Sequence, residues 1–150
     1  MVGRPWVDQE LMCAAAFQGN VVCMNVQNGR LVWNAKVDAV TGPVADGRLV
    51  YEVDDASRIH AFNRQNGREA WVNESFLYRS ASAPIRVGTS LAFGDYEGNI
   101  TFLDPATGTP VARTKLSGAV TTPAAQYGYG AVFQTVEGDV AYVVEGADSE

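Results

Sequence analysis

Short apolar runs alternate with short polar turns along the whole chain. One stretch reads "APIRV", "SLAFGD", "NITFLD" and "PVARTK", and these runs are separated by "GT", "YEG" and "PATG". The β-branched and aromatic residues of the runs favour strands, whereas the Gly, Pro and Asp residues between them favour turns. No window of about a dozen residues keeps apolar positions at helical spacing free of Gly or Pro. The pattern therefore predicts an all-β protein built from four-stranded antiparallel units.

The second run of each unit is apolar at consecutive positions, as in "LMCAAAF", "LVYEV", "LAFGD" and "AVFQT". A strand with one face in solvent alternates apolar and polar residues, and that alternation is missing here. Continuous apolar strands are typical of sheets that are covered on both faces. We therefore expect the sheets to stack face to face.

One phrase recurs with a period of about 40 residues. It reads "CMNVQNGRLVW", "AFNRQNGREAW" and "FLDPATGTPVA". Two further markers keep the same period, the turn residues Gly19, Ser57, Gly98 and Gly138 and the prolines Pro5, Pro43, Pro84 and Pro123. Four strands repeated at this spacing predict the blades of a β-propeller. We expect units at about 1–38, 39–79, 80–119 and 120–145, followed by a polar tail at 146–150.

The glycines of the phrase are Gly29, Gly67 and Gly108. We expect each to lie in a hairpin turn of two or three residues that requires a positive φ, which Gly adopts without steric cost. Asn28 and Asn66 precede the first two glycines. Asn tolerates the left-handed region, so these residues are also expected to fit the turn.

Two tryptophans, Trp33 and Trp71, open the fourth strand of their units directly after the NG turn. A ring of this size buries on the order of 200 Å². We expect each indole to lie across the joint with the next sheet, so that the tryptophans and the three glycines together dock one blade on the next. The third repeat carries Ala112 in the tryptophan position, and its joint is expected to be packed differently.

The fourth unit runs out after "DVAYVV" into "EGADSE", which is polar and too short for another strand. Propellers close with about four to eight blades. We therefore expect about four blades here, half of an eight-bladed ring, with the last blade incomplete. Two explanations stay open: an N-terminal segment of a longer propeller supplies the missing strand, or two copies associate head to tail.

Charge and composition exclude several classes of protein. The net charge is -6, and no basic cluster could neutralise a phosphate backbone, so nucleic acid is not expected as a partner. No apolar run approaches the roughly 18 residues that cross a bilayer, and the segment after Met1 lacks the pattern of a signal peptide.

The two cysteines, Cys13 and Cys23, are too few for a disulfide framework and lack the companions of a zinc site. On a hairpin that turns at Gln18 and Gly19 they fall on the same or on opposite faces, depending on a shift of one residue in register. We expect buried free thiols.

The acidic residues Asp54, Asp55, Asp95 and Glu97 fall at hairpin turns, where carboxylates bind backbone amides. No calcium-binding loop surrounds them. His60 is the only histidine, and no nucleophile has an identifiable relation to it. We therefore assign no catalytic, cofactor-binding or metal-binding residue.

The connection "SFLYRSAS" between the second and third units is unusually apolar for a turn. Tyr and Arg are favoured in protein interfaces, so Phe76, Tyr78 and Arg79 form a candidate partner-binding segment. The alternative is that Phe76 and Leu77 only fill the gap between two blades.

The repeated phrase resembles that of quinoprotein-like propellers, Ala-x-Asp-x-x-Thr-Gly-x-x-x-Trp, and only the third copy keeps both the Asp and the Thr, as Asp104 and Thr107. More narrowly, "GDYEGNITFLDPATG" and the linker "ESFLYRSASAP" resemble the BamB family, lipoproteins of the outer-membrane β-barrel assembly machinery. This resemblance covers essentially the whole chain.

The BamB resemblance implies an eight-bladed, non-enzymatic scaffold without a cofactor in the periplasm, tethered by an N-terminal lipid and docked on the periplasmic domains of BamA. The lipidated cysteine and its signal are absent from this sequence, and no partner-binding residue is transferred. The alternative is part of a dehydrogenase or sensor of the pyrroloquinoline quinone (PQQ) type. Such enzymes use a carboxylate-bound calcium, a catalytic Asp and usually an adjacent Cys-Cys pair.

Overall fold

The computed structural model describes residues 2–16 and 19–145, and these residues form fifteen strands and no helix. None of them could therefore supply a helix that crosses a membrane. The chain divides into two compact units, Met1–Tyr78 and Arg79–Glu150. All strand pairs within the sheets are antiparallel, which confirms the predicted all-β class.

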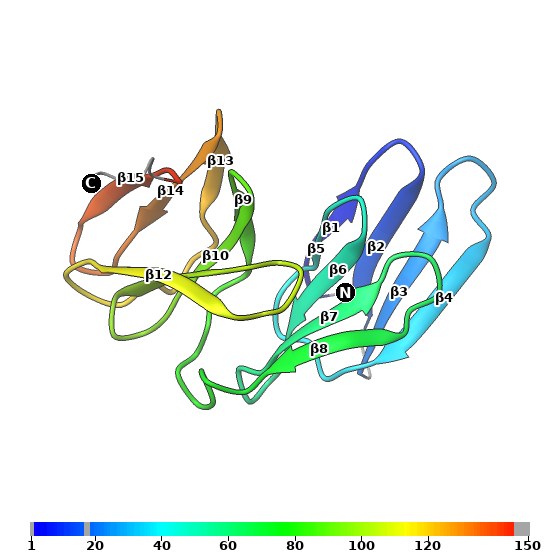
Figure 1. Cartoon of the computed structure of the whole chain (residues 1–150), viewed down its shortest axis with the longest axis horizontal. Coiled ribbons are helices and arrows are strands. Elements are labelled where there is room, and N and C mark those ends of the chain that lie inside the picture. The colour runs from blue at the N-terminus through cyan, green and yellow to red at the C-terminus, as the bar shows by residue number, and fades with distance from the viewer. Residues whose placement is uncertain (1, 17–18, 146–150) are drawn as a thin grey trace. The chain divides into compact units, whose positions relative to one another are not determined.

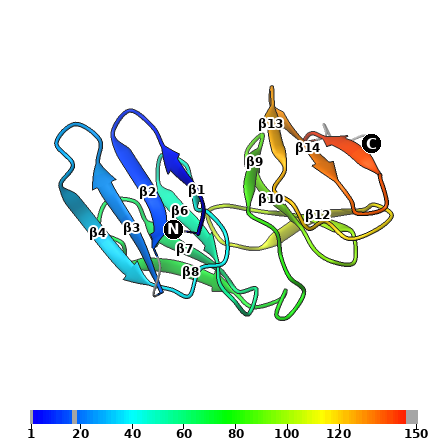
Figure 2. The same ribbon diagram turned by 180° about the vertical axis from the view of Figure 1, so that it is seen from behind.

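The first unit contains two four-stranded sheets. The first sheet runs in chain order and lies in blue to cyan in Figure 1, as β1 (Val2–Val7), β2 (Leu11–Ala16), β3 (Asn20–Asn25) and β4 (Leu31–Lys36). The second sheet also runs in chain order, as β5 (Val44–Ala45), β6 (Leu49–Val53), β7 (Ile59–Asn63) and β8 (Glu69–Asn73). Figure 2 shows β6, β7 and β8 from behind. One apolar core joins the two sheets and includes Leu11, Val21, Trp33, Val50 and Phe62.

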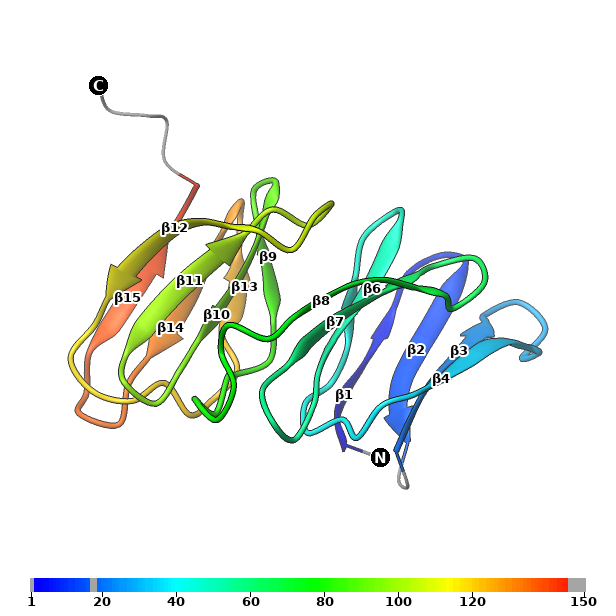
Figure 3. The same ribbon diagram turned by 60° about the horizontal axis from the view of Figure 1, so that its bottom comes forward.

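The second unit contains the third and fourth sheets, which Figure 3 shows in green to red. The third sheet consists of β9 (Ile85–Val87), β10 (Ser90–Gly94), β11 (Asn99–Leu103) and β12 (Pro110–Lys115). The fourth has three strands within the described residues, β13 (Ala125–Tyr127), β14 (Gly130–Gln134) and β15 (Val140–Val143). The predicted polar tail at 146–150 lies outside the part of the chain that the structure describes.

The core of the second unit is built without a tryptophan. Phe102, Val120 and Phe133 fill it together with smaller aliphatic side chains from the third and fourth sheets. Ala112, which stands in the tryptophan position of the third repeat, is exposed on β12. This joint therefore relies on phenylalanine and valine side chains from other positions.

Burial along the strands follows the apolar runs of the sequence. β10 and β11 are buried at every position, as expected for strands covered on both faces. β2 differs, because its residues alternate between buried and half-buried. The outer strand β12 is exposed along its whole length.

The three copies of the repeated phrase form the same turn. In the first copy the amide of Asn25 donates to the carbonyl of Arg30, and the amide of Gly29 donates to the carbonyl of Asn25. The connection therefore spans four residues, where two or three were expected. Gly29, Gly67 and Gly108 have φ angles of 69°, 75° and 74°, in the left-handed region that the turn requires.

The asparagines before the glycines act differently from the prediction. Asn28 and Asn66 are not among the described residues with positive φ. Instead, the Oδ1 atom of Asn28 accepts a hydrogen bond from the amide of Arg30, and that of Asn66 accepts one from the amide of Arg68, both at 2.9 Å. The side chain binds the backbone of the turn, which explains the residue type without a left-handed conformation.

The residue four positions before each glycine also stabilises the turn through its side chain. Side-chain oxygens of Asn25, Asn63 and Asp104 each accept a hydrogen bond from the amide two residues later, at 2.8 to 2.9 Å. The position that carries Asp in the quinoprotein-like phrase is therefore a turn position in this chain.

Candidate functional site

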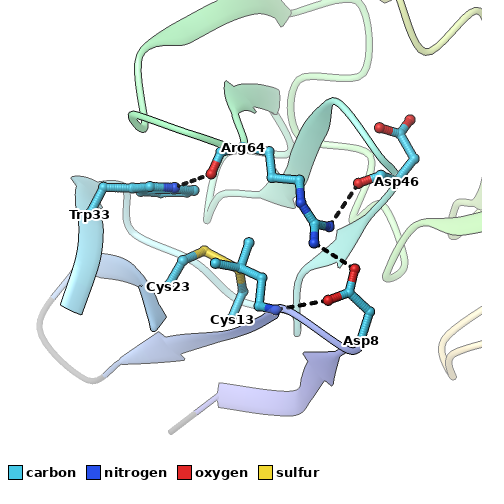
Figure 4. The surroundings of a disulfide bond; sticks show 7 residues. Asp8, Cys13, Cys23, Trp33, Asp46 and Arg64 are labelled. Atoms are coloured by element: carbon cyan, nitrogen blue, oxygen red, sulfur yellow. Dashed lines mark hydrogen bonds and ion pairs between the residues drawn. A yellow bond between two sulfur atoms is a disulfide. The ribbon is translucent and has the colours of Figure 1, made fainter. Parts of the chain in front are cut away.

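The joint between the first two sheets is centred on Trp33, which is 6% exposed. Its Nε1 atom donates a hydrogen bond of 2.7 Å to the carbonyl of Arg64 (Figure 4). The indole lies 6.0 Å from the ring of Phe62, measured between ring centres. It also covers Gly67, where an added Cβ would lie 2.6 Å from the indole. Trp33 thus leaves its own sheet and rests on the turn of the following repeat.

The equivalent glycine of the first repeat has no such neighbour. Gly29 shares the left-handed conformation of Gly67, but a Cβ on Gly29 would meet no described atom within 4 Å. Gly67 therefore satisfies two requirements, a positive φ and close approach by an indole, and Gly29 satisfies only the first.

Arg64 connects the same turn to both sheets. Its Nη1 atom donates to the carbonyl of Asp46 at 3.0 Å, and its Nη2 atom lies 2.6 Å from Oδ2 of Asp8 (Figure 4). The guanidinium also stands 5.3 Å from the centre of the Trp6 ring, within range of a cation–π interaction. The sequence carries no signal for this role, because an arginine in a turn is ordinarily a solvated residue.

Asp8 is held in its charged form by this arrangement. Burial alone would raise the pKa of its carboxyl. Amides of Leu11 and Glu10, each 2.8 Å from Oδ1, and the guanidinium of Arg64 outweigh that effect, so the pKa lies below its usual range.

Trp71, the second predicted docking residue, is half-buried on β8. It stands opposite Ala61 of β7, and its ring centre lies 6.0 Å from that of Tyr51 on β6. The described ring contact of Trp71 is thus made within its own sheet, and its role in docking stays a prediction.

A fully buried carboxyl, Glu52, lies on β6. Its Oε1 atom accepts hydrogen bonds from the Thr41 hydroxyl at 2.7 Å and from the Val53 amide at 2.9 Å, whereas Oε2 has no partner among the described atoms. Burial raises the pKa of Glu52 to about 8, although both hydrogen bonds act in the opposite direction. The sequence carries no signal for a buried carboxyl here, because Glu52 stands inside an otherwise apolar run.

The prediction of free thiols is wrong, because Cys13 and Cys23 form a disulfide. The register of β2 and β3 places the two residues directly opposite each other, with a Cα–Cα distance of 4.1 Å (Figure 4). Both side chains therefore point to the same face of the sheet. The sequence left this register open, and Gln18 of the connecting turn lies outside the described residues.

The acidic turn residues bind backbone amides. Oδ1 of Asp54 accepts from the amides of Ala56 and Arg58, both at 2.9 Å. Oδ1 of Asp95 accepts from the amides of Glu97 and Asn99 in the same manner. The neighbouring Asp55 contributes its own amide, which donates to the carbonyl of Asp38.

His60 lies between two carboxylates. Its Nε2 atom is 2.8 Å from Asp54, its Nδ1 atom is 2.7 Å from Glu69, and its ring stacks on Phe62. Burial would raise the pKa of Asp54, but hydrogen bonds from His60 and Arg58 lower it overall. These contacts tie neighbouring strands of the second sheet together.

The residues of the predicted partner-binding segment differ in how far their side chains are exposed to solvent. Phe76 is 1% exposed, whereas Tyr78 is 79% exposed and has a φ of 62°. Leu77 is half-buried. Nη1 of Arg79 lies 3.9 Å from Oδ2 of the buried Asp95, a loose ion pair. Of the three candidate residues, Tyr78 is the one that presents most of its side chain to solvent.

Comparison with known proteins places these features in a family. A family model described as outer membrane protein assembly factor BamB matches residues 1–73. BamB of Bordetella pertussis is 34% identical over 95% of this chain and 38% of its own length. The crystal structure of BamB from Moraxella catarrhalis matches with a TM-score of 0.88 at 24% identity, over 93% of this chain and 42% of that one.

Quinoprotein enzymes share the fold at lower similarity. Quinohemoprotein alcohol dehydrogenase from Comamonas testosteroni matches with a TM-score of 0.61 at 20% identity, over 76% of this chain and 21% of that one. The fold and the repeated turn thus define a β-propeller of quinoprotein-like repeats. Within that class, the chain belongs to the BamB family. It spans less than half the length of these relatives.

The residues present do not fit the quinone chemistry of such enzymes. Cys13 and Cys23 are ten residues apart and bridge two strands inside a core, so they are no adjacent pair against a cofactor. The carboxylates of Asp54 and Asp95 already bind backbone amides. Among the described residues, no group of three or more His, Cys, Asp or Glu side chains is placed to hold a metal ion.

Proposed function

We propose that this chain is part of a non-enzymatic propeller scaffold that supports the assembly and insertion of outer-membrane β-barrel proteins. The observation that carries the proposal is the continuous similarity to Bordetella pertussis BamB, 34% identity over 95% of the chain. The dehydrogenase likeness is limited to the fold, at 20% identity. The relatives are named as outer membrane protein assembly factors, and the same role is proposed for this chain.

The proposed place of action is the periplasm, with attachment to the outer membrane through an N-terminal lipid on the full-length protein. The disulfide between Cys13 and Cys23 supports an oxidising compartment, because such bonds do not persist in a reducing cytosol. The proposed partners are the periplasmic domains of BamA and other subunits of the assembly machinery. A second copy of this chain, bound head to tail, is a further proposed partner.

Tyr78 and Arg79 are the proposed contact residues. An exposed tyrosine beside an arginine supplies a large amphipathic surface and a guanidinium, which are enriched among residues that dominate binding energy. Phe76 belongs to the same segment but is buried, so its proposed part is to anchor the segment.

The test is the affinity of the full-length protein for the BamA periplasmic domains, measured by isothermal calorimetry. Changing Tyr78→Ala and Arg79→Ala together is expected to weaken binding by at least tenfold, since hot-spot residues contribute about 2 kcal/mol or more. Tyr129→Ala is the matched control, because Tyr129 is 87% exposed in the turn between β13 and β14. Unchanged affinity of the double variant would remove the assignment of this segment, and absence of binding by the wild type would remove the proposed partner.

A further inference from the structure

The disulfide between Cys13 and Cys23 is sealed inside the first unit. Both residues have no exposed surface. Cys23 stands opposite Trp33 in the next strand, and the pair shares its core with Val50 of β6 and Phe62 of β7. The second sheet and the Trp33 indole therefore cover the bond on the face where it lies.

Formation of this bond requires a reagent that can reach the sulfur atoms. A thiolate of the chain attacks the disulfide of an oxidant, a mixed disulfide forms, and the second thiolate then displaces the oxidant. In total the two thiols lose two protons and two electrons, and the disulfide of the oxidant is reduced to a dithiol. This exchange brings a third sulfur into line with the reacting pair, and the packed core leaves no space for it.

We propose that the chain is a substrate of an oxidised dithiol catalyst, which joins Cys13 to Cys23 in the open β2–β3 hairpin before the second sheet covers it. The ten-residue separation of the cysteines keeps this step local, because the two strands can pair without the rest of the unit. After packing, the bond is a permanent cross-link. These are the only two cysteines of the chain, so no third thiol is present to reopen it. The inference concerns maturation of the chain and does not depend on the proposed scaffold function.

The decisive experiment measures access to the bond in the intact, oxidised wild-type chain. Dithiothreitol is added with and without a denaturing concentration of urea, and free thiols are trapped over time with a maleimide that shifts the band on a gel. We expect reduction to be at least a hundredfold slower without urea. Equal rates would mean that the bond is open to reagents in the folded chain, and the proposal would be wrong. This measurement needs no variant that has to fold.

A second experiment tests the oxidant. Reduced, denatured chain is diluted into buffer with a dithiol catalyst that lacks its second cysteine and carries a pre-formed mixed disulfide with a small thiol. With the wild type the expected products are the oxidised chain and a free catalyst thiol, because the second thiolate of the chain displaces the catalyst. Cys23→Ala lacks that thiolate, so a covalent adduct of chain and catalyst is expected to accumulate with it, and none is expected with the Cys13→Ala, Cys23→Ala double variant. An absence of adduct with Cys23→Ala, or of oxidised chain with the wild type, would overturn the role of the catalyst, even if the folded bond is protected.

The contribution of the cross-link is measured by comparing oxidised and reduced wild type, which contain the same side chains. Closing a loop of this length is expected to shift the unfolding equilibrium by on the order of a hundredfold toward the folded state. Equal urea midpoints for the two forms would contradict a structural role for the bond.

Discussion

At the scale of single residues, each position of the repeated phrase has its own physical task. Asn25 and Asn28 bind amides of the turn, and Gly29 supplies the left-handed conformation. Trp33 follows and fills the joint with the next sheet. Polar turn residues and the large apolar ring are adjacent in sequence because the hairpin turn ends where the outer strand begins.

Gly67 and Gly29 give a matched pair of substitutions. Gly29→Ala is expected to lower the free energy of unfolding by about 1–2 kcal/mol, because alanine is strained at positive φ. Gly67→Ala carries the same strain and also drives a methyl group into the Trp33 indole, which adds about 1–3 kcal/mol. Urea unfolding monitored by tryptophan fluorescence measures both values. Equal losses would show that contact with the indole contributes nothing at Gly67.

At the scale of elements, the joint between the first and second sheets combines apolar packing with a small number of buried polar groups. The guanidinium of Arg64 donates hydrogen bonds to the carboxylate of Asp8 and to the carbonyl of Asp46, and these bonds stabilise the turn that carries Arg64. The carboxyl of Glu52 on β6 has fewer hydrogen bonds than it could accept, because its Oε2 atom has no hydrogen-bond partner among the described atoms. A charged carboxylate there is unfavourable, so the carboxyl of Glu52 holds its proton to unusually high pH.

Glu52 is expected to make stability depend on pH. Its pKa is about 8 in the folded chain and near 4.5 in the unfolded chain, so its stabilising contribution is complete below about pH 4.5. That contribution is lost as the pH rises toward 8. Glu52→Gln keeps a hydrogen-bond acceptor for Thr41 but cannot ionise. At pH 8 the variant is therefore expected to have a free energy of unfolding higher than that of the wild type by roughly a few kcal/mol, as the size of the pKa shift of Glu52 implies.

The measurement is urea unfolding of both proteins between pH 5 and 9. The difference between variant and wild type should grow through this range and level off above about pH 8. Glu97→Gln is the control, because Glu97 is exposed in a turn. A difference that does not change with pH would contradict the assigned protonation of Glu52.

At the scale of the whole molecule, the chain carries the blades of a BamB-type propeller in two compact units. Its proposed role is to present surfaces to partners, and among the described residues no group of three or more His, Cys, Asp or Glu side chains is placed to hold a metal ion. The likeness of this chain to the dehydrogenases is a likeness of fold, and a fold does not by itself carry an activity, since sites are formed by side chains.

A scaffold without a cofactor is expected not to bind the quinone PQQ. Addition of PQQ and calcium to the purified chain is expected to leave the melting temperature and the absorbance spectrum of the quinone unchanged. A ligand present at a hundred times its dissociation constant would stabilise the chain by about 2.7 kcal/mol, which a melting curve detects readily. A saturable shift that requires both PQQ and calcium would instead favour the dehydrogenase or sensor alternative.

The features that the sequence determined by itself are local and periodic. Turn chemistry, apolar strand runs and the spacing of about 40 residues identified the antiparallel blades and the positive φ at Gly29, Gly67 and Gly108. These features depend on residues within a few positions of one another. Even here the prediction was inexact, because Asn28 and Asn66 use their side chains and not a left-handed backbone.

Only the tertiary structure decided which distant groups meet. The disulfide depended on the register of β2 and β3, where a shift of one residue would have placed Cys13 and Cys23 on opposite faces. The ion pair of Arg64 and the burial of Glu52 and Phe76 depended on packing between elements, because the same side chain is solvated in an open turn and buried in a packed structure. Sequence pattern specifies the elements through short-range chemistry, and burial and charge pairing are set when the elements pack.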